Sequence, residues 1–481
     1  MEFPEQLFVV DTQWRAAVMR EADEPFDVAI IGAGVVGCAV FRELVLSGLR
    51  TVLIEKDADV INGASKANSA LLHTGFDASP RSLEAKLVRE GYAYYRSVRE
   101  QLGLPLLETE ATLVAWSETE AAALPSIVDR AHANGVMDVR LASRDEILRR
   151  EPHLAKDLVA GVIVPGESVI DAWSAPLSYA LQGLLNGGEM RRSTTVLGGR
   201  LENDVWTLQT NAEPIRARIV VNCAGNFGDL IEAIARPSPF EMRPRKGQFV
   251  VLDKSASRLL NSILLPVPNE RTKGVVVTRT AFGNVLVGPT AEEQRERDFP
   301  TTDGRIIADL LHQGRRMIPA LASEPITASY AGLRPATQFK DYQIEALPTE
   351  RWITVAGIRS TGLTSALGIG AYVAGLYAQH FGPLKKIAEP QWVLMPNLTE
   401  GLERPWMCPG RSEIICHCEM VTRAEIEAAL HGEFPARSLG GLKRRTRVMM
   451  GRCQGFYCTR RTLELTGSAI PGLVEPLEGR T

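Results

Sequence analysis

The order of apolar and polar residues at the start of the chain predicts a buried strand, a tight turn, a helix and a second buried strand. Residues 26–56 begin with an apolar run, continue through a glycine-rich turn and an apolar helix, and end with another apolar run. Two similar runs, 217–221 and 352–356, are each followed by small residues and glycine. Apolar runs of this length are typical of parallel strands covered on both faces. We therefore expect three distant parts of the chain to lie side by side in one parallel sheet.

The rest of the chain has a different pattern. Alternating, strand-like stretches such as 248–252 and 274–278 predict a second sheet that is largely antiparallel. Residues 383–409 are rich in Pro and Trp and have no clear periodicity, which indicates a linker that wraps back over the body. Beyond it, Thr422 and Glu425 have the spacing of a capping box, which opens a short helix in a compact C-terminal module.

Composition and charge narrow the class of protein. The chain has 481 residues, 45% of them hydrophobic, which is enough for a large core and several domains. A formal net charge of −3 gives no general attraction to nucleic acid or anionic lipid. Residues 1–25 carry acids throughout and lack an apolar signal core, and no long apolar stretch follows them. We expect a cytoplasmic protein with at most peripheral attachment to the inner face of a membrane.

A basic run at 443–447 is a local exception to this balance. One interpretation is a solvated helix face, and the other is a docking patch for an acidic redox partner.

Three glycines near the start indicate a dinucleotide site. Gly32, Gly34 and Gly37 form a G-x-G-x-x-G turn between a strand and a helix, and Glu55 ends the next strand. Gly32 permits the tight turn, Gly34 lets the backbone approach a pyrophosphate at the helix N-terminus, and Gly37 lets helix and strand pack closely. We expect Glu55 to accept hydrogen bonds from the adenosine ribose.

The glycine spacing does not separate NAD from FAD, but the loop at 63–75 favours FAD. This loop is rich in small residues and hydrogen-bond donors, so it is suited to follow a flavin ribityl chain at close range. A second G-x-G-x-x-G unit for a nicotinamide cofactor is absent from the sequence. The predicted cofactor contacts in this region are Lys56, Ser65, Asn68 and Ser69.

With these residues, the chain resembles the FAD-dependent glycerol-3-phosphate dehydrogenase and L-2-hydroxyglutarate dehydrogenase group of the D-amino-acid-oxidase-like flavoproteins. The resemblance covers nearly the first 380 residues and rests on several motifs in the same order. These motifs are Arg245-Lys246-Gly247-Gln248-Phe249, Thr272-Lys273-Gly274, Gly288-Pro289-Thr290, Gly332-Leu333-Arg334-Pro335 and Gly357-Ile358-Arg359-Ser360-Thr361-Gly362-Leu363-Thr364.

The resemblance implies an α/β fold with a discontinuous FAD-binding Rossmann-like domain and an antiparallel-sheet substrate domain, followed by a small α-helical module. The FAD-binding parts would span about 26–90, 155–235 and 335–382, the substrate-domain parts about 91–154 and 236–334, the linker 383–409 and the module 410–472. Further cofactor contacts would come from Ala224, Gly225, Gly357, Thr361, Gly362, Leu363 and Thr364. The helix that starts near Gly362 would direct its N-terminal dipole at the flavin N1–C2=O edge.

Candidate catalytic groups follow from the same motifs. Arg334 lies where the family places an anion clamp over the flavin, and its planar fork suits a carboxylate or phosphate. Lys246 and Lys273 would add positive field at that anion or at flavin N1. His73 is the only histidine within a cofactor-proximal motif, so it is either the general base for a hydroxyl proton or a packed, positioning residue.

Four C-terminal cysteines form two tight pairs, Cys416-x-Cys418 and Cys453-x4-Cys458. Paired cysteines in zinc ribbons favour a two-residue gap, whereas gaps of one and four fit a ferredoxin-type site better. The surrounding residues resemble the bacterioferritin-associated-ferredoxin-like [2Fe–2S] domain, so we expect a [2Fe–2S] cluster, with structural zinc as the alternative. His417 is not counted as a ligand. Of the remaining cysteines, Cys38 and Cys223 lie in apolar runs typical of core thiols, and Cys408 is unassigned.

Together these features predict an FAD-dependent dehydrogenase. It would oxidise a C–OH of a small anionic substrate, glycerol 3-phosphate or a 2-hydroxy acid such as L-2-hydroxyglutarate. Electrons would leave through the cluster to a quinone or a redox protein subunit, in a homo- or hetero-oligomer. The alternatives are an amine- or amino-acid-oxidising flavoenzyme, an oxidase with a zinc-held clasp, and a non-catalytic electron-transfer subunit. Trp173 and Tyr330 would discriminate among substrates if they line the pocket.

Overall fold

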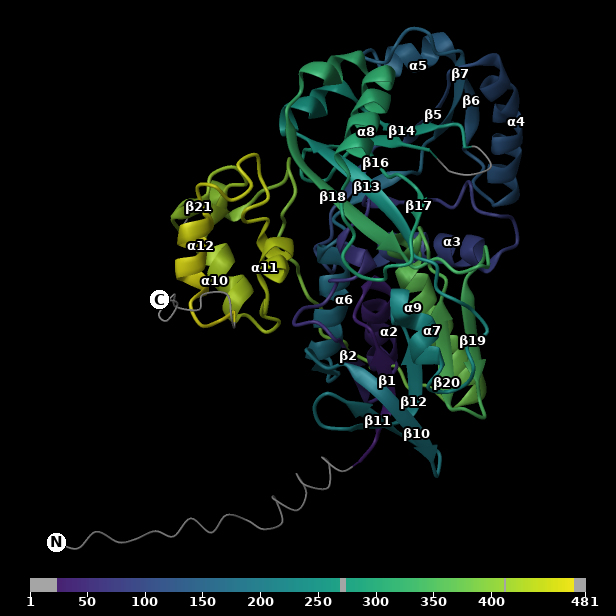
Figure 1. The fold of residues 1–481 in the computed structure, drawn as a ribbon, viewed down its shortest axis with the longest axis vertical. Helices are drawn as coiled ribbons and strands as arrows, with labels where there is room; N and C mark the ends of the chain where they lie inside the picture. The colour runs from purple at the N-terminus through teal and green to yellow at the C-terminus, as the bar shows by residue number, and fades with distance from the viewer. Residues whose placement is uncertain (1–23, 269–273, 411, 471–481) are drawn as a thin grey trace, which may run out of the picture.

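The computed structural model describes residues 24–268, 274–410 and 412–470. Two sheets and the helices around them form an elongated body, and the C-terminal module lies against its side (Figure 1). The expectations that fall on residues 1–23, 471–472 and Lys273 lie outside the described residues. Within the described part of the chain, no helix has the length and apolar character to cross a bilayer.

The first sheet contains the three strands that the apolar runs predicted. Strand β1 pairs in parallel with β2 and with β12, and β12 pairs in parallel with β20. The order is β10-β11-β12-β1-β2-β9, with β20 beside β12 and β19 beside β20. The strands are β1 Phe26–Ile31, β2 Thr51–Ile54, β9 Glu189–Arg191, β10 Val196–Glu202, β11 Val205–Thr210, β12 Ile215–Asn222, β19 Gln343–Leu347 and β20 Trp352–Ala356.

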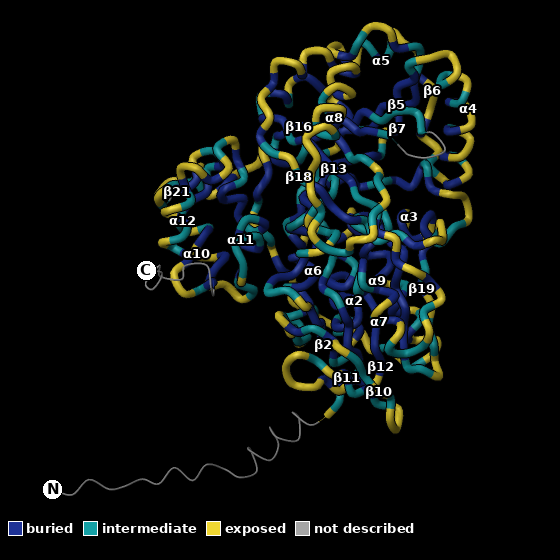
Figure 2. The backbone as a smooth tube through the Cα atoms, in the orientation of Figure 1, coloured by how far each residue is buried: buried dark blue, intermediate teal, exposed yellow. Residues whose placement is uncertain are grey.

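Apolar helices cover this sheet. Helix α2 packs against α6 and α9, and α3 packs against α9. Their buried side chains join those of β1, β2, β12 and β20 in one large core, seen as continuous dark blue in Figure 2. The helices are α2 Val35–Leu46, α3 Leu83–Val98, α6 Ser174–Leu185, α7 Gly228–Glu232 and α9 Gly362–His380.

The second sheet is antiparallel, as expected, apart from one parallel pair, β14 with β5. It has the order β17-β13-β16-β15-β14-β5-β7-β6, and β18 pairs along the whole of β13. The strands are β5 Ala111–Ala115, β6 Arg140–Ser143, β7 Ala160–Val164, β13 Arg245–Leu252, β14 Ile263–Pro266, β15 Val276–Arg279, β16 Val285–Gly288, β17 Glu292–Glu293 and β18 Ile326–Arg334. Helices α4 Glu118–Ala133, α5 Arg144–Arg150 and α8 Gly304–Met317 surround it.

The chain passes between the two domains at two places that differ from the expected domain boundaries. Helix α3 reaches Val98 but packs with α9 beside the first sheet, and β7 at 160–164 belongs to the second sheet. A small sheet of β3 Leu71–Leu72, β4 Leu106–Glu108 and β8 Ser168–Ile170 lies at these crossings. We therefore propose that the chain passes from the FAD-binding domain to the substrate domain after α3 and returns after β7, because the packing partners of a segment decide to which domain it belongs.

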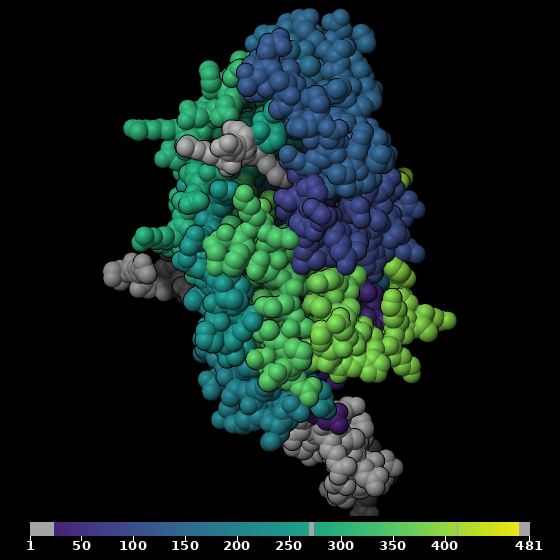
Figure 3. Space-filling view, turned by 90° about the vertical axis from the view of Figure 1, so that its right-hand side faces the viewer, coloured from purple at the N-terminus to yellow at the C-terminus, as the bar shows by residue number. Residues whose placement is uncertain are grey.

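The linker and the module follow their sequence pattern closely. Residues 383–409 run over the outside of the body. The Lys385 N–H donates a hydrogen bond to the Ser47 carbonyl, and the Met395 N–H donates one to the Leu102 carbonyl. Figure 3 shows this segment in light green on the surface beside the purple residues of the α3 region. The module contains β21 Ile414–Cys416, β22 Val421–Thr422, α10 Arg423–His431, α11 Leu439–Thr446 and α12 Thr459–Thr466, around a small core of its own. The predicted capping box opens α10, and Gly432 ends it.

Candidate functional site

The glycine turn between β1 and α2 is shaped partly by the protein's own packing. Gly32 has φ +104°, and a Cβ there would lie 2.5 Å from the carbonyl oxygen of Cys223. A Cβ on Gly37 would lie 1.9 Å from the Gly32 carbonyl oxygen. A Cβ on Gly34 would meet only Ser65 Oγ, at 3.2 Å. Gly34 provides no side-chain cap, and Ser65 Oγ accepts the Val35 N–H, so a phosphate would approach the helix start at Gly34 beside the Ser65 hydroxyl.

Glu55 lies directly beneath the turn. Its Oε2 accepts the Ala33 N–H at 2.8 Å and its Oε1 accepts the Asp57 N–H at 3.0 Å. Burial raises the pKa of this carboxyl group above its ordinary value. A buried carboxylate held by two backbone donors at the end of β2 fits the ribose-binding role predicted for it.

The loop at 63–75 joins this turn. Ser65 Oγ accepts the Val35 N–H at 3.0 Å, and Asn68 bridges the Ser65 carbonyl and the Ala70 N–H. Ser69 lies half-buried beside Asn68. The Lys56 ammonium lies 3.3 Å from Asp298 and over the ring of Phe227, and its contact with the cofactor stays a prediction.

The ends of β12 and β20 lie at the same edge of the sheet. Ala224 and Gly225 follow β12, and the Ala224 N–H donates to Asn222 Oδ1. Gly357 follows β20 with φ +72°. Because ligands of open α/β sheets bind at the carboxyl ends of the strands, these residues fit a cofactor site together with the glycine turn.

Helix α9 begins beside the same edge. Thr361 precedes Gly362 and Leu363 at the helix start, and its hydroxyl donates to Glu84 Oε1 at 2.7 Å. Thr364 Oγ1 accepts the His73 N–H at 3.0 Å. The α9 N-terminus and the 63–75 loop are therefore joined by the Thr364 side chain.

His73 forms a pair that the sequence did not reveal. Its Nδ1 lies 2.9 Å from Oε2 of Glu167, whose side chain is fully buried. Oε1 of Glu167 accepts both the N–H and the hydroxyl of Thr74. Glu167 lies in the turn between β7 and β8, where an acidic residue is typical of a surface turn, so no sequence signal marked it.

Arg334 and Lys246 lie at the same end of the long β13–β18 pair. Arg334 is opposite Arg245, and its Nη2 donates to the Thr290 carbonyl at 3.1 Å. Burial, with Arg245 nearby, lowers the pKa of the Arg334 guanidinium below its ordinary value. Lys246 lies next to this position, but its ammonium is 3.2 Å from Glu292. Arg334 is thus the stronger candidate for an anion, while the role of Lys246 stays a prediction.

The two aromatic residues considered for the pocket have definite neighbours. Tyr330 stacks on Phe249 with ring centroids 4.7 Å apart, and its hydroxyl donates to the Asn68 carbonyl. Trp173 stacks on Phe282 at 5.4 Å, and its Nε1 donates to the Lys66 carbonyl at 3.1 Å. Both rings therefore contact the 63–75 loop through backbone oxygens.

The four module cysteines lie together, two by two. Cys418 interacts with Cys453, and Cys458 with Cys416. A Cβ on Gly451 would lie 2.3 Å from Cys418 Cβ, so this glycine lets the two ligand segments approach. Among the described residues, no three His, Cys, Asp or Glu side chains are grouped to hold a single metal ion. The thiols of Cys416, Cys418, Cys453 and Cys458 would be the four ligands of a [2Fe–2S] cluster.

The loop after Cys453 directs backbone donors at its sulfur. The N–H groups of Tyr457, Gly455 and Phe456 lower the pKa of the Cys453 thiol. Such donors stabilise thiolate ligands and fit an iron–sulfur site. Cys408 instead contacts Glu403 and the Arg404 carbonyl, while Cys38 and Cys223 are buried in the body.

Both interpretations of the basic run 443–447 are wrong. Arg444, Arg445 and Arg447 are largely buried between the module and the body, so they form neither a solvated face nor an exposed patch. Burial lowers the pKa of Arg444 and of Arg445. The run joins two parts of the molecule, because each buried guanidinium finds its partners across the contact or beside it.

Asp59 is the centre of one such contact. It follows β2 in the dinucleotide loop, and its Oδ2 accepts the Arg437 N–H at 2.9 Å. Its Oδ1 lies 2.9 Å from Arg445 Nη2. A Cβ on Gly441 would lie 1.7 Å from Asp59 Oδ2, so α11 packs directly on this carboxylate. The module is therefore seated on the same loop that carries Glu55.

Other contacts connect the module to the second sheet. Arg452 forms two 2.8 Å hydrogen bonds with Asp253, which follows β13. Lys254 Nζ lies 3.4 Å from Glu419, the residue after Cys418. The cluster segments thus face the body on one side.

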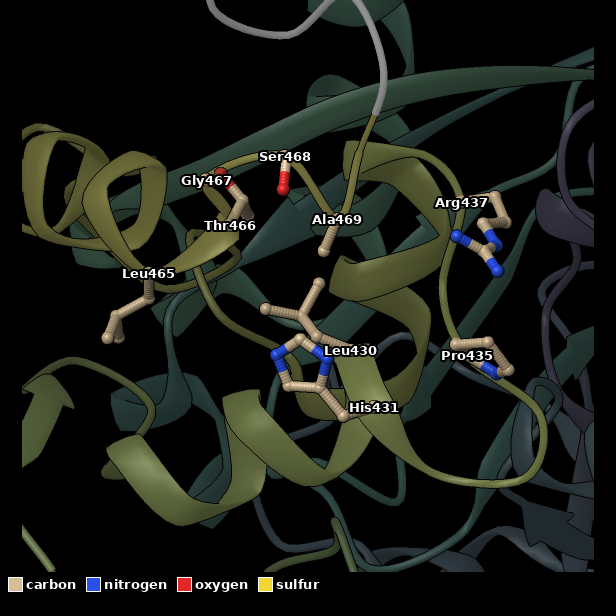
Figure 4. A pocket seen from close by; sticks show the side chains of 9 residues that line it. All are labelled: Leu430, His431, Pro435, Arg437, Leu465, Thr466, Gly467, Ser468 and Ala469. Atoms are coloured by element: carbon tan, nitrogen blue, oxygen red, sulfur yellow. The ribbon is translucent and has the colours of Figure 1, made fainter. Parts of the chain in front are cut away.

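A hollow of about 480 Å³ lies in the module (Figure 4). It contains none of the predicted site residues. Its lining residues are Leu430, His431, Pro435, Arg437, Leu465, Thr466, Gly467, Ser468 and Ala469. The flavin and cluster features lie elsewhere, so this hollow is not the active site.

This fold and these two sites define a flavin-dependent oxidoreductase joined to an iron–sulfur module. Residues 27–376 match the FAD dependent oxidoreductase family, and residues 414–466 match the BFD-like [2Fe-2S] binding domain. The chain belongs to the FAD dependent oxidoreductase family and carries this iron–sulfur domain at its C-terminus. The predicted cofactors, FAD and a [2Fe–2S] cluster, are confirmed by these matches, so the zinc alternative is set aside.

Individual relatives agree with the family. The chain is 32% identical over 452 residues, 92% of this chain and 93% of the relative, to a glycerol 3-phosphate dehydrogenase of Caloramator mitchellensis. It is 28% identical over 302 residues, 58% of this chain and 65% of the relative, to the human mitochondrial L-2-hydroxyglutarate dehydrogenase. The solved FAD-bound L-alpha-glycerophosphate oxidase from Mycoplasma pneumoniae superposes with a TM-score of 0.71 at 30% identity, covering 76% of this chain and 97% of that one. The prediction of a flavin enzyme acting on CH–OH is confirmed.

Proposed function

We propose that the protein oxidises glycerol 3-phosphate, with a 2-hydroxy acid such as L-2-hydroxyglutarate as the second candidate. The similarity to the glycerol 3-phosphate dehydrogenase extends over 92% of the chain, while that to the human L-2-hydroxyglutarate dehydrogenase extends over 58%. The longer match reaches into the cysteine module, which supports this order of candidates.

The observation that carries the proposal is the half-buried guanidinium of Arg334, whose Nη2 donates to the Thr290 carbonyl at 3.1 Å. Burial and Arg245 lower its pKa, and no carboxylate among the described residues offsets this effect. A cation in this state is stabilised by an anion, and the guanidinium fork binds phosphate or carboxylate through two parallel hydrogen bonds. An anionic substrate held here would present its adjacent carbon to the flavin side of the site.

The His73–Glu167 pair supports the removal of the hydroxyl proton. When Nδ1–H donates to Glu167, Nε2 is the ring nitrogen that can accept a proton. Nε2 would take the substrate O–H proton while the carbon gives up its hydride. Thr74 holds Glu167 in place through two hydrogen bonds, so the orientation of the imidazole ring depends on a fixed carboxylate.

The cofactors complete this chemistry. FAD supplies the hydride acceptor when bound, and the [2Fe–2S] cluster passes electrons singly. The final acceptor, in our proposal, is a redox partner protein or a quinone.

Anaerobic titration of the holoprotein tests the proposal. Glycerol 3-phosphate should bleach the flavin fully, L-2-hydroxyglutarate less efficiently, and amino acids not at all. Arg334→Gln should weaken glycerol 3-phosphate binding by about 100-fold, since a hydrogen-bonded charge contributes about 3 kcal/mol. The matched control is Arg245→Gln, because Arg245 lies opposite Arg334 but is more exposed and lies 3.9 Å from Glu293. Bleaching by amino acids alone would overturn the proposal.

A further inference from the structure

A continuous series of contacts joins the 63–75 loop to a cluster-ligand segment. It begins at the Lys66 carbonyl, which accepts the Trp173 Nε1–H at 3.1 Å. The indole of Trp173 stacks on Phe282, with ring centroids 5.4 Å apart and planes 16° from parallel. Phe282 lies in the loop between β15 and β16, so three segments distant in sequence meet here.

Phe282 also contacts the C-terminal module, through Arg447. The Cζ atom of Arg447 lies 3.9 Å from the centroid of the Phe282 ring. Arg447 Nε lies 2.8 Å from Oε2 of Glu419, which follows the ligand Cys418. Side chains in contact with one another therefore extend from the 63–75 loop to Glu419, the residue next to the cluster ligand Cys418.

The burial of Phe282, Arg447 and Glu419, against which the half-buried Trp173 packs, argues against an incidental surface contact. Phe282 is 7% exposed, Arg447 3% and Glu419 1%. Two charges have been removed from water here, which costs free energy that the ion pair and the cation–π contact must offset. Arg447 is held at this place as the C-cap of α11, where its φ of +67° ends the helix.

The second stacked pair of the body does not share this arrangement. Tyr330 also reaches the 63–75 loop, through the Asn68 carbonyl, and stacks on Phe249. Both residues of that pair belong to the paired strands β18 and β13, so the pair ends inside the second sheet. The Trp173–Phe282 pair is the one that continues to Arg447 of the module.

We propose that Trp173, Phe282 and Arg447 form the path by which electrons cross from the flavin side to the cluster side. Trp173 and Phe282 provide packed atoms for tunnelling, and Arg447 is a positioning residue that holds the Glu419–Cys418 segment against Phe282. The inference rests on the proposed function. Oxidation of one C–OH releases two electrons and two protons: the hydride carries both electrons and one proton, and His73 takes the other proton. The two electrons would then cross singly to the external acceptor, and the proton that the hydride carried would be released as they leave.

The test compares two events after mixing the holoprotein anaerobically with glycerol 3-phosphate. Stopped-flow absorbance follows flavin bleaching, and freeze-quench EPR follows the appearance of the reduced cluster. In Trp173→Leu and Phe282→Leu, cluster reduction should fall by about tenfold or more relative to flavin bleaching. Arg447→Lys keeps a cation for Glu419 but loses the planar contact with the ring, so it should give a smaller loss.

Phe240→Leu is the matched control. Phe240 is a buried aromatic residue of the body that packs with Met242 and Ala356, so the substitution makes the same chemical change away from the contact. It should leave the ratio of the two rates unchanged. Unchanged ratios in Trp173→Leu and Phe282→Leu would overturn the proposal.

Two further measurements distinguish a failure of the electron path from undocking of the module and from a failure of the proposed function. Limited proteolysis within residues 383–409 reports whether the module stays docked. Trp173 lies on the body side of the contact, so slow cluster reduction in Trp173→Leu with a docked module supports the path. Release of the module in that variant counts against the path. Photoreduction of the flavin replaces the substrate as electron source, so the path is tested even if glycerol 3-phosphate fails to bleach the flavin and the proposed function falls.

Discussion

Oε2 of Glu167 lies 2.9 Å from Nδ1 of His73, while Oε1 accepts two hydrogen bonds from Thr74. Both oxygens of this buried carboxylate are therefore engaged, and the imidazole ring is held with Nδ1 towards the acid. Three residues from two segments, 73–74 and 167, form one hydrogen-bonded unit.

Replacing this acid should slow substrate oxidation without abolishing substrate binding. Glu167→Gln keeps the shape of the side chain but removes the charge that orients the ring, and His73→Asn removes the base. Each change should lower the rate of flavin bleaching by about 100-fold or more, the range expected for a general base. The dissociation constant from anaerobic titration should change far less. A large loss of affinity with an unchanged rate would contradict the assignment.

The glycines of the turn should respond differently to alanine. Gly37→Ala places a Cβ 1.9 Å from a backbone oxygen, so we expect a loss of about 3 kcal/mol in the free energy of unfolding of the FAD-free protein. Gly34→Ala meets only Ser65 Oγ at 3.2 Å and should fold with little change. The same Gly34→Ala protein should bind FAD weakly, because the methyl group occupies the approach to the pyrophosphate. Denaturant unfolding and flavin content measure the two effects, and normal FAD content in Gly34→Ala would contradict the site.

FAD binding should weaken in mild acid because of Glu55. The carboxylate is the form that accepts hydrogen bonds from ribose hydroxyls, and burial raises the pKa of this group. Affinity is therefore full above the raised pKa and falls as the pH drops through it, at a milder acidity than for an ordinary Glu. Glu55→Gln should remove this step and weaken FAD by about tenfold at neutral pH. Fluorescence of released flavin across a pH series measures both the loss of FAD in mild acid and the weaker binding in Glu55→Gln. If Glu55→Gln loses FAD over the same pH range as the wild type, the pH dependence belongs to another group.

Docking of the C-terminal module on the body should depend on Asp59. Asp59→Ala leaves Arg445 buried without its acid and removes the acceptor of the Arg437 N–H, so docking should lose about 3 kcal/mol. Asp57→Ala is the matched control, because the Asp57 carboxylate accepts a hydrogen bond from Asn62, at 2.9 Å through Oδ2, and among the described residues it forms no ion pair with the module. Proteolysis within residues 383–409 should accelerate in the first variant and not in the second. Equal proteolysis rates would show that other contacts hold the module.

The cluster should tolerate the loss of one cysteine and not another. Cys453→Ser removes a thiol that receives three backbone N–H groups, so bound iron and the visible spectrum of the cluster should be lost. Cys408→Ser changes a thiol that contacts Glu403 and the Arg404 carbonyl, and iron content should remain that of the wild type. Iron analysis of both purified proteins checks this, and iron loss in Cys408→Ser would bring Cys408 into the site.

Much of the fold was predictable because its signals are local. The apolar runs identified β1, β12 and β20 as neighbours in a parallel sheet, and the register Phe26–Ala217 and Val220–Trp352 agrees. The turn before α2 was predictable because the conformation of Gly32 and the space at Gly37 permit no side chain. The cysteine spacing likewise indicated the four thiols of the module, whereas the contacts of Cys418 with Cys453 and of Cys416 with Cys458 are seen only in the structure.

The pairing of charges was decided by the tertiary structure alone. Glu167 lies 94 residues from His73, and Asp59 lies far along the chain from Arg445, so neither pair has a local signal. The basic run looked solvent-exposed in the sequence because most arginines remain in water. Whether a charged side chain can be buried depends on a partner that neutralises it, and here that partner comes from another part of the fold.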